Sequence, residues 1–378
     1  MGIGNAKVWL RELVISVVLV VCGLGPVAVI AGEAEEVTSG YDNGFYFQRG
    51  DQKLKVYGYI QTLWTAEFGD ESLDSNEFMV KRGRLLLSGN MVKDLGFKMH
   101  VDFAASRPLL DYFVDYVPTK AFGLRAGQFK TPLGRQFLCS AAEKQFVDDT
   151  ISTSEFKADR DIGLMAHGEF STGKVEYQAG VFNGSGKNAR QDNTDLLYVA
   201  RLALNPLGRM KITESDLTGG MDPLLSIAVS TAYNTLLQEA GSGNDVSTVE
   251  AKRWILSGEL AFQWAGLSAT SEVFWRLSDQ LRVPGAIDEA DLAAMGGHVQ
   301  AGYFVIPSSL ELGARAALVR PDSAVHNNDL TEFGFLAGWF FGGHQLKLQA
   351  DYTVLVDEEP GADAVTDHRV RLQLQAAF

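Results

Sequence analysis

Cysteine is almost absent from this sequence, in which the only two are Cys22 and Cys139. Cys22 falls inside an apolar stretch near the N terminus, without the small residue directly before it that a lipoprotein signal needs. If that stretch is removed, Cys139 is alone, which excludes a disulfide framework and a pair of metal-binding thiols. We therefore expect one inert thiol and no metal or other cofactor.

Positively charged residues are also fewer than negatively charged ones. The chain has 33 Lys and Arg residues against 47 Asp and Glu, a formal net charge of −14. Nucleic-acid binding needs a clustered positive surface, so the sequence predicts no nucleic-acid partner. A Walker phosphate-binding loop and a dinucleotide-binding fingerprint are also missing. The six histidines are scattered and show no HExxH spacing, so no catalytic residue is predicted.

Long apolar runs are missing after residue 31, so no later segment reaches the length of a membrane-spanning helix. At the N terminus, Lys7 and Arg11 precede an apolar run that is followed by small residues up to Ala31 and Ala34. This order is typical of a secretory signal peptide, cleaved after one of those two alanines. We assign residues 1–31 to it, and a retained membrane anchor is the alternative.

The dominant pattern in the rest of the chain is alternation with a period of two, which predicts β-strands from about residue 54 onward. Residues 97–104 show it well. Apolar and polar side chains there alternate between two faces, with Phe97, Met99, Val101 and Phe103 on one and Lys98, His100 and Asp102 on the other. One face suits lipid and the other suits water.

Sixteen such segments are predicted, and an even number is usual for bacterial barrels. They begin near Leu54, Phe78, Gly96, Leu110, Phe122, Asp161, Val175, Leu196, Leu224, Arg253, Leu267, Gly296, Leu310, Asp329, Gln345 and Arg369. Short connections such as 93–95 alternate with long ones such as 183–194, as in barrels whose long loops face outward. We expect residues 32–53 to be an acidic lead-in and residues 54–378 to be one transmembrane antiparallel β-barrel.

A soluble sandwich also alternates, so three further features favour a membrane barrel. The five tryptophans after the signal lie on the apolar side of their strands, as in the aromatic girdles of barrels, although they could also be core anchors: Trp64, Trp254, Trp264, Trp275 and Trp339. The opposite side carries charges in mid-strand, which need water. The chain also ends in an alternating strand closed by Phe378, similar to the assembly signal of bacterial barrels.

Several motifs in these strands resemble those of the phosphate-selective porin O/P family over most of the chain after the signal. They are Phe78-Met-Val-Lys-Arg-Gly-Arg-Leu-Leu-Leu-Ser-Gly89, Leu124-Arg-Ala-Gly-Gln-Phe-Lys-Thr-Pro-Leu-Gly134, Arg160-Asp-Ile-Gly163, Gly180-Val-Phe-Asn-Gly184 and, more weakly, Arg201-Leu-Ala-Leu-Asn-Pro206. The resemblance implies a sixteen-stranded barrel, usually a homotrimer, whose third outer loop folds inward as a constriction. Here that loop would run from Thr131 to about Arg160.

Clustered basic residues in some members of that family bind phosphate or polyphosphate, and this sequence offers candidates for anion contacts. Those expected to line the pore are Arg82, Arg84, Lys98, Arg125, Lys130, Arg201, Arg276, Arg315 and Lys347, and Arg369 and Arg371 continue the pattern. Those on the constriction loop are Arg135, Lys144, Lys157 and Arg160. Alternatively, the lumen residues are structural ion pairs, neutralised by Asp111, Asp115, Glu169, Glu176, Glu259 or Glu272.

The sequence thus predicts an outer-membrane porin for passive diffusion of small anions or other small polar solutes, with membrane lipid around it. The expected constriction loop carries more acidic than basic residues, which leaves a general or weakly cation-preferring pore open. Two other classes remain as alternatives: a barrel hydrolase, which would need a Ser, His and acid constellation, and a secreted β-rich binding protein. His100 and His167 fit a polar lining better than a catalytic role.

Overall fold

The computed structural model describes residues 36–69, 72–191, 193–240, 247–279 and 292–378, and residues 38–378 form one compact unit. The predicted signal peptide, residues 1–31, lies outside the described residues. Within these ranges the helices are few and short: α2 Arg135–Leu138, α3 Ile151–Phe156 and the 3-10 turn η1 Ser171–Gly173. No helix in the described part of the chain has the length and apolar character needed to cross a membrane.

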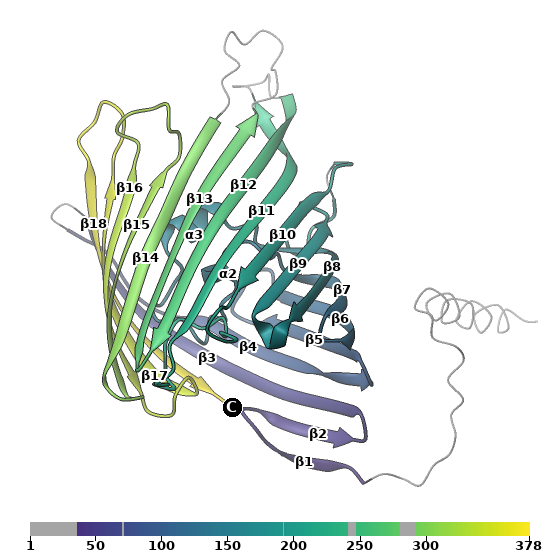
Figure 1. Cartoon of the computed structure of the whole chain (residues 1–378). Coiled ribbons are helices and arrows are strands. Elements are labelled where there is room, and N and C mark those ends of the chain that lie inside the picture. Colours follow the sequence, from purple (N-terminus) through teal and green to yellow (C-terminus); the bar gives the residue numbers. More distant parts are fainter. Residues whose placement is uncertain (1–35, 70–71, 192, 241–246, 280–291) are drawn as a thin grey trace, which may run out of the picture. The chain divides into compact units, whose positions relative to one another are not determined.

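Sixteen strands form the wall of a barrel (Figure 1). They are β3 Gln52–Gly69, β4 Ser72–Val92, β5 Leu95–Asp102, β6 Leu109–Thr119, β7 Phe122–Lys130, β8 Arg160–Phe170, β9 Val175–Phe182, β10 Leu197–Leu204, β11 Leu224–Ala240, β12 Ser247–Trp264, β13 Leu267–Asp279, β14 Leu292–Ile306, β15 Leu310–Arg320, β16 Leu330–Phe340, β17 Leu346–Asp357 and β18 Val365–Ala377. Each pairs antiparallel with the next, which confirms the predicted all-β barrel and its sixteen strands.

The barrel is closed by the pairing of β18 with β3, where Gln375 lies opposite Gln61 and Leu372 opposite Trp64. Closure satisfies the backbone groups of both terminal strands, and a bilayer tolerates no open sheet edge. The predicted strand starts depart most at β4 and β12. Their first residues, such as Ser72 and Ser247, are polar and suggest loops, yet they continue the ladders into long hairpins.

A short hairpin precedes the barrel within the segment that was expected to be an acidic lead-in. It consists of β1 Thr38–Tyr41 and β2 Phe45–Arg49. Strand β2 pairs with the start of β3, where Phe45 lies opposite Val56. The pairing of β18 with β3 ends close by, where Ala377 lies opposite Tyr59. There the backbones of Phe378 and Gly58 exchange two hydrogen bonds of 2.9 and 3.2 Å. The hairpin therefore extends the wall at the end that carries the C terminus.

The outer surface carries the apolar side chains that alternation predicted. Trp254 and Trp275 lie outward at one level, and Trp264 and Trp339 lie outward beside the short turns 265–266 and 341–345. Trp254 and Trp264 are ten positions apart on β12, which corresponds to about 33 Å along a strand or roughly 25 Å across a membrane at the usual strand tilt. This spacing matches the apolar band of a transmembrane barrel.

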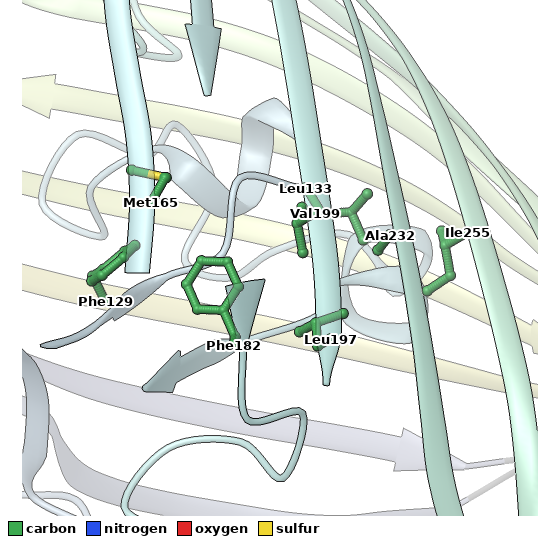
Figure 2. Packing of buried hydrophobic residues seen from close by; sticks show 8 residues of the cluster. All are labelled: Phe129, Leu133, Met165, Phe182, Leu197, Val199, Ala232 and Ile255. Carbon is green, nitrogen blue, oxygen red and sulfur yellow. The ribbon is translucent and has the colours of Figure 1, made fainter. Parts of the chain in front are cut away.

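The inner surface is not uniformly polar. Inward apolar residues of β7 to β12 form one cluster with a residue of the β7–β8 connection, as Figure 2 shows: Phe129, Leu133, Met165, Phe182, Leu197, Val199, Ala232 and Ile255. A second cluster joins Phe156 of α3 to Phe274, Ala294 and Val319 of β13, β14 and β15. Both clusters lie where the β7–β8 connection packs against the wall, which is why these strands are apolar inside.

Candidate constriction site

The connection between β7 and β8, residues 131–159, folds into the lumen as predicted and carries α2 and α3 (Figure 1). Its two ends are tied together, because the backbone N–H and hydroxyl of Thr131 both donate to the carbonyl oxygen of Asp159, at 3.1 and 2.7 Å. Lys130 at the end of β7 donates to the carbonyl oxygens of Phe137 and Cys139 at 2.6 and 2.8 Å. Lys130 therefore anchors the loop and is engaged by protein atoms.

The loop crosses the lumen and contacts strands far along the chain. The side-chain amide of Gln145 donates to Glu311 of β15 at 2.6 Å and to Ser268 of β13 at 2.8 Å. The backbone N–H of Val147 donates to Asp351 of β17 at 3.1 Å. These buried bonds hold the loop across the interior, so we call residues 131–159 the constriction loop.

Asp148 of the constriction loop meets three cations of the wall. Its carboxylate pairs with Lys81, with Nη2 of Arg82 at 3.1 Å and with Nη1 of Arg371 at 2.8 Å. Its backbone carbonyl accepts a hydrogen bond of 2.8 Å from Arg315. We call Lys81, Arg82, Arg315 and Arg371 the basic cluster.

The charges around Asp148 do not cancel. Arg371 also pairs with Asp351 at 2.7 Å, and Arg315 also pairs with Glu332. The basic cluster thus faces three carboxylates, and one positive charge is left over. Burial alone would raise the pKa of Asp148, but Lys81, Arg82 and Arg371 outweigh it and hold that pKa well below its ordinary value. Asp148 is therefore a stable anion within a basic surrounding.

A β-bulge explains how two adjacent residues reach the same carboxylate. Gln61 pairs with Arg82 and Thr62 with Val80, so Lys81 is an extra residue in β4. In a regular strand, neighbours point to opposite faces, whereas a bulge re-aims one of them. Alternation therefore placed Lys81 on the lipid side, and it was not predicted as a pore residue. The motif Lys81-Arg82-Gly83 gives no local sign of the bulge.

Other predicted pore residues form ion pairs within the wall, as the structural alternative proposed. Arg84 donates to Asp102 at 2.8 Å, and Arg125 pairs with Asp115 at 2.6 Å. Lys98 and Arg160 share Asp111, at 3.1 and 2.8 Å. Arg160 was predicted to lie on the constriction loop, but it is the first residue of β8 and so belongs to the wall.

The remaining wall candidates are buried against other protein groups. Arg201 makes a two-pronged ion pair with Glu259, with a shortest distance of 2.6 Å. Arg276 pairs with Glu155 of α3 at 2.7 Å. Lys347 donates to the backbone carbonyl of Lys144 at 2.8 Å. Arg201 thus binds β12, Arg276 and Lys347 bind the constriction loop, and none of the three belongs to the basic cluster.

The basic residues of the constriction loop are also occupied. Arg135 donates to the carbonyl oxygen of Lys211 at 2.6 Å. Lys144 pairs with Asp149 and lies 3.6 Å from Glu214, and Lys157 lies 3.9 Å from Asp149. Burial alone would lower the pKa of Lys144, but the two carboxylates outweigh it and raise that pKa. The structure therefore does not bring these loop cations together with the basic cluster.

A cavity of about 660 Å³ lies between the constriction loop and the wall. Its polar lining includes Lys55 of β3, Lys98 of β5, Glu143 of the loop and His344 and Gln345 of the β16–β17 turn. The volume is large enough for a hydrated small ion, since a single water needs only about 30 Å³. The cavity therefore provides aqueous space beside the loop, with two lysines and one carboxylate in its lining.

One buried constellation contains the residue types of a hydrolase triad. Ser152 Oγ lies 3.0 Å from Nδ1 of His298, whose Nε2 is 4.0 Å from Glu272. The second distance is too long for a hydrogen bond, and Ser152 and Glu272 are almost fully buried. A nucleophile must be reachable by substrate, so this arrangement serves to hold α3 against β13 and β14. In the described residues, no group of three or more His, Cys, Asp or Glu could hold a metal ion.

Comparison with known proteins also points to a β-barrel of the outer membrane. A family model described as phosphate-selective porin O and P matches residues 55–378. No curated protein is similar enough in sequence to count as a match.

Solved structures share the fold at low sequence identity. The anion-selective porin from Comamonas acidovorans is 11% identical with a TM-score of 0.61, over 87% of this chain and 100% of that one. The outer membrane channel DcaP of Acinetobacter baumannii is 13% identical with a TM-score of 0.58, over 90% and 100%. The trimer form of OmpT of Vibrio cholerae is 12% identical with a TM-score of 0.56, over 86% and 99%.

Proposed function

Because the chain belongs to the phosphate-selective porin O and P family, whose members are outer-membrane porins for passive diffusion of small hydrophilic solutes, we propose that its pore prefers anions. The observation that carries the proposal is the basic cluster around Asp148, where one positive charge remains after pairing. A fixed excess charge at a narrow point attracts ions of opposite sign and repels the others. Small inorganic anions, phosphate among them, are the proposed solutes.

The acidic composition of the constriction loop does not oppose this proposal. Asp148 is neutralised by the wall, Asp149 by Lys144, and Glu155 by Arg276. Three of the carboxylates that make the loop acidic in sequence are therefore engaged in ion pairs that hold the loop. Glu143 is the loop carboxylate that lines the cavity, and the lining also includes Lys55 and Lys98.

A weakly selective pore is the second candidate, and a specific observation favours it. Most predicted pore cations are paired within the wall, as in Arg84 with Asp102 and Arg125 with Asp115. A paired charge exerts a weak field beyond its partner, since the two potentials largely cancel. If these pairs dominate the potential, the pore discriminates little between chloride and potassium.

Reversal potentials in planar bilayers under a potassium chloride gradient distinguish the two candidates. Replacing Arg82→Glu removes a cation of the basic cluster and is expected to shift the reversal potential toward cations. Replacing Asp148→Asn unmasks the basic cluster and is expected to shift it toward anions. Asp363→Asn, at an exposed position of the β17–β18 loop, is the matched control. Equal reversal potentials in the unaltered protein and in all three variants would reject the anion preference.

The same experiment separates Arg82 from Arg84. Both face inward, but Arg84 is held by Asp102 at 2.8 Å and by the hydroxyl of Tyr59 at 2.7 Å, away from the constriction loop. Arg84→Glu should therefore change the potential less than Arg82→Glu does. Phosphate added to one side, with current recorded, tests whether the pore conducts or is blocked by that anion.

We propose a homotrimer in the outer membrane, surrounded by lipid. Its export would depend on a cleaved signal peptide, residues 1–31. Family membership and the fold shared with OmpT, whose structure is described as a trimer, support the trimer. Support for the lipid contact comes from the outward tryptophans. Cross-linking of the native protein tests the trimer, and N-terminal sequencing of the mature protein tests cleavage after Ala31 or Ala34.

The proposal includes no enzymatic activity. Family membership points to a channel, and the Ser152 hydroxyl is enclosed by the loop and wall. Hydrolysis of a chromogenic ester by the purified barrel, lost in Ser152→Ala, would contradict this assignment.

A further inference from the structure

The connection between β10 and β11, residues 205–223, is unlike the others at its end of the barrel. The described connections there, from 93–94 to 341–345, are two to five residues long, as expected of periplasmic turns. This one has nineteen residues. Met210, Glu214, Ser215 and Asp216 in it are buried. A plain turn would be solvated, so the segment enters the lumen.

Glu214 in this segment holds the constriction loop directly. Its carboxylate accepts hydrogen bonds from the backbone N–H of Gln145 at 2.9 Å and from the side chain of Gln300 on β14 at 3.0 Å. The same carboxylate lies 3.6 Å from Nζ of Lys144. The backbone N–H of Glu214 donates to the carbonyl oxygen of Glu143 at 3.5 Å. Three consecutive loop residues are therefore bound by one residue of the periplasmic segment.

The rest of the segment is fixed to the wall and to the start of the loop. Ser215 donates to Glu311 of β15 at 2.8 Å, and Asp216 accepts from the backbone N–H of Gly266 in the β12–β13 turn at 2.8 Å. At the other side, the carbonyl oxygen of Lys211 accepts the hydrogen bond from Arg135. The segment thus connects the wall to the constriction loop from the end of the barrel that carries the short turns.

We propose that residues 207–219 are a second constriction element, inserted from the periplasmic end, and that Glu214 is the positioning residue that sets the place of the constriction loop. Gln145 lies three positions before Asp148, so a loop released at Gln145 moves away from the basic cluster. The segment therefore determines pore width, a property that is separate from the proposed anion preference.

Single-channel recordings in planar bilayers at symmetric salt test the proposal. Glu214→Ala is expected to give folded barrels with higher conductance and larger current noise, because Lys144 and Gln145 lose their contacts with the Glu214 carboxylate and are then held only by the wall and the loop itself. Removal of residues 207–219 is expected to raise the conductance about twofold, since conductance follows the open cross-section. Asp222→Asn, an exposed carboxylate in the same connection, is the matched control and should behave as the unaltered protein does.

Folding is followed separately by the heat-dependent shift of the barrel in gel electrophoresis. If the deletion does not fold, Glu214→Gln keeps the question open to measurement, because it preserves size and one acceptor while losing the charge beside Lys144. Unaltered conductance and noise in folded Glu214→Ala would overturn the proposal, even if the barrel melted earlier. The reversal potential tests anion preference independently, so either proposal can fail alone.

Discussion

Nη1 of Arg371 lies 2.8 Å from the carboxylate of Asp148, although the two residues are 223 positions apart in the chain. Arg371 belongs to the last strand of the barrel and Asp148 to the constriction loop. Arg371 also pairs with Asp351 on β17. The contact therefore joins the seam strand, its neighbour and the loop, and it depends on closure of the barrel.

The loop contact at Asp148 should persist in mild acid. The pKa of Asp148 is lowered from 3.8, so its ion pairs stabilise the docked loop fully above that ordinary value. This stabilisation is lost only as the pH falls through the lowered value. The current noise that reports loop movement should therefore stay constant between pH 7 and about pH 4. A rise in noise already at pH 5, absent in Asp148→Asn, would contradict this assignment.

Selectivity should change at a higher pH than loop docking does, because of Glu143. Burial raises the pKa of this carboxyl above its ordinary value of 4.5. As the pH falls through the raised value, the cavity loses the negative charge of Glu143, and the two lysines in its lining are no longer opposed by that charge. Anion preference should therefore increase as the pH is lowered from 7 toward 4.5. Reversal potentials of Glu143→Gln should show no such pH dependence.

Cys139 should not react in the native barrel. Its side chain is buried, and burial raises the pKa of the thiol to about 12, so the reactive thiolate is scarce at pH 8. A maleimide should label the protein only after heat unfolding. As a positive control, Asp363→Cys combined with Cys139→Ser places a thiol at an exposed position and should be labelled at once. Rapid labelling of native Cys139 would show that the constriction loop opens.

The Arg201 and Glu259 pair should be costly to break singly. Both side chains are buried, and the bonds are two-pronged. Glu259→Gln should destabilise the barrel by about 3–5 kcal/mol, because it leaves a buried guanidinium without its counter-charge. The double change Arg201→Met with Glu259→Leu should recover most of that loss. Urea unfolding followed by tryptophan fluorescence measures both, and equal losses in the two variants would argue against a pairing effect.

The outward tryptophans should be in contact with lipid. Trp254 and Trp275 are expected at one interface of the bilayer, and Trp264 and Trp339 at the other. Lipids brominated near the headgroups should therefore quench their fluorescence. Variants that keep a single tryptophan, with phenylalanine at the other positions, assign the quenching to each level. Absence of quenching at both levels would reject the membrane orientation.

Alternation in the sequence determined the barrel wall. Side chains of a strand change faces at every residue, so a local pattern is enough to assign Phe103 to the outer face and Asp102 to the inner face. The closed sheet was then predicted from sixteen such segments, the last of which ends the chain, and from the family motifs. The loop at residues 131–159 was also predictable, because it is too long for a plain turn.

Only the tertiary structure decided which of the predicted basic residues meet at the constriction. The bulge at Lys81, the Asp148 contact and the entry of Glu214 from the opposite end each depend on residues far apart in the chain. Alternation gives the face of a side chain but neither its height in the barrel nor its partner across the lumen. Those depend on closure and on loop packing, which bury each charge beside whatever partner the fold supplies.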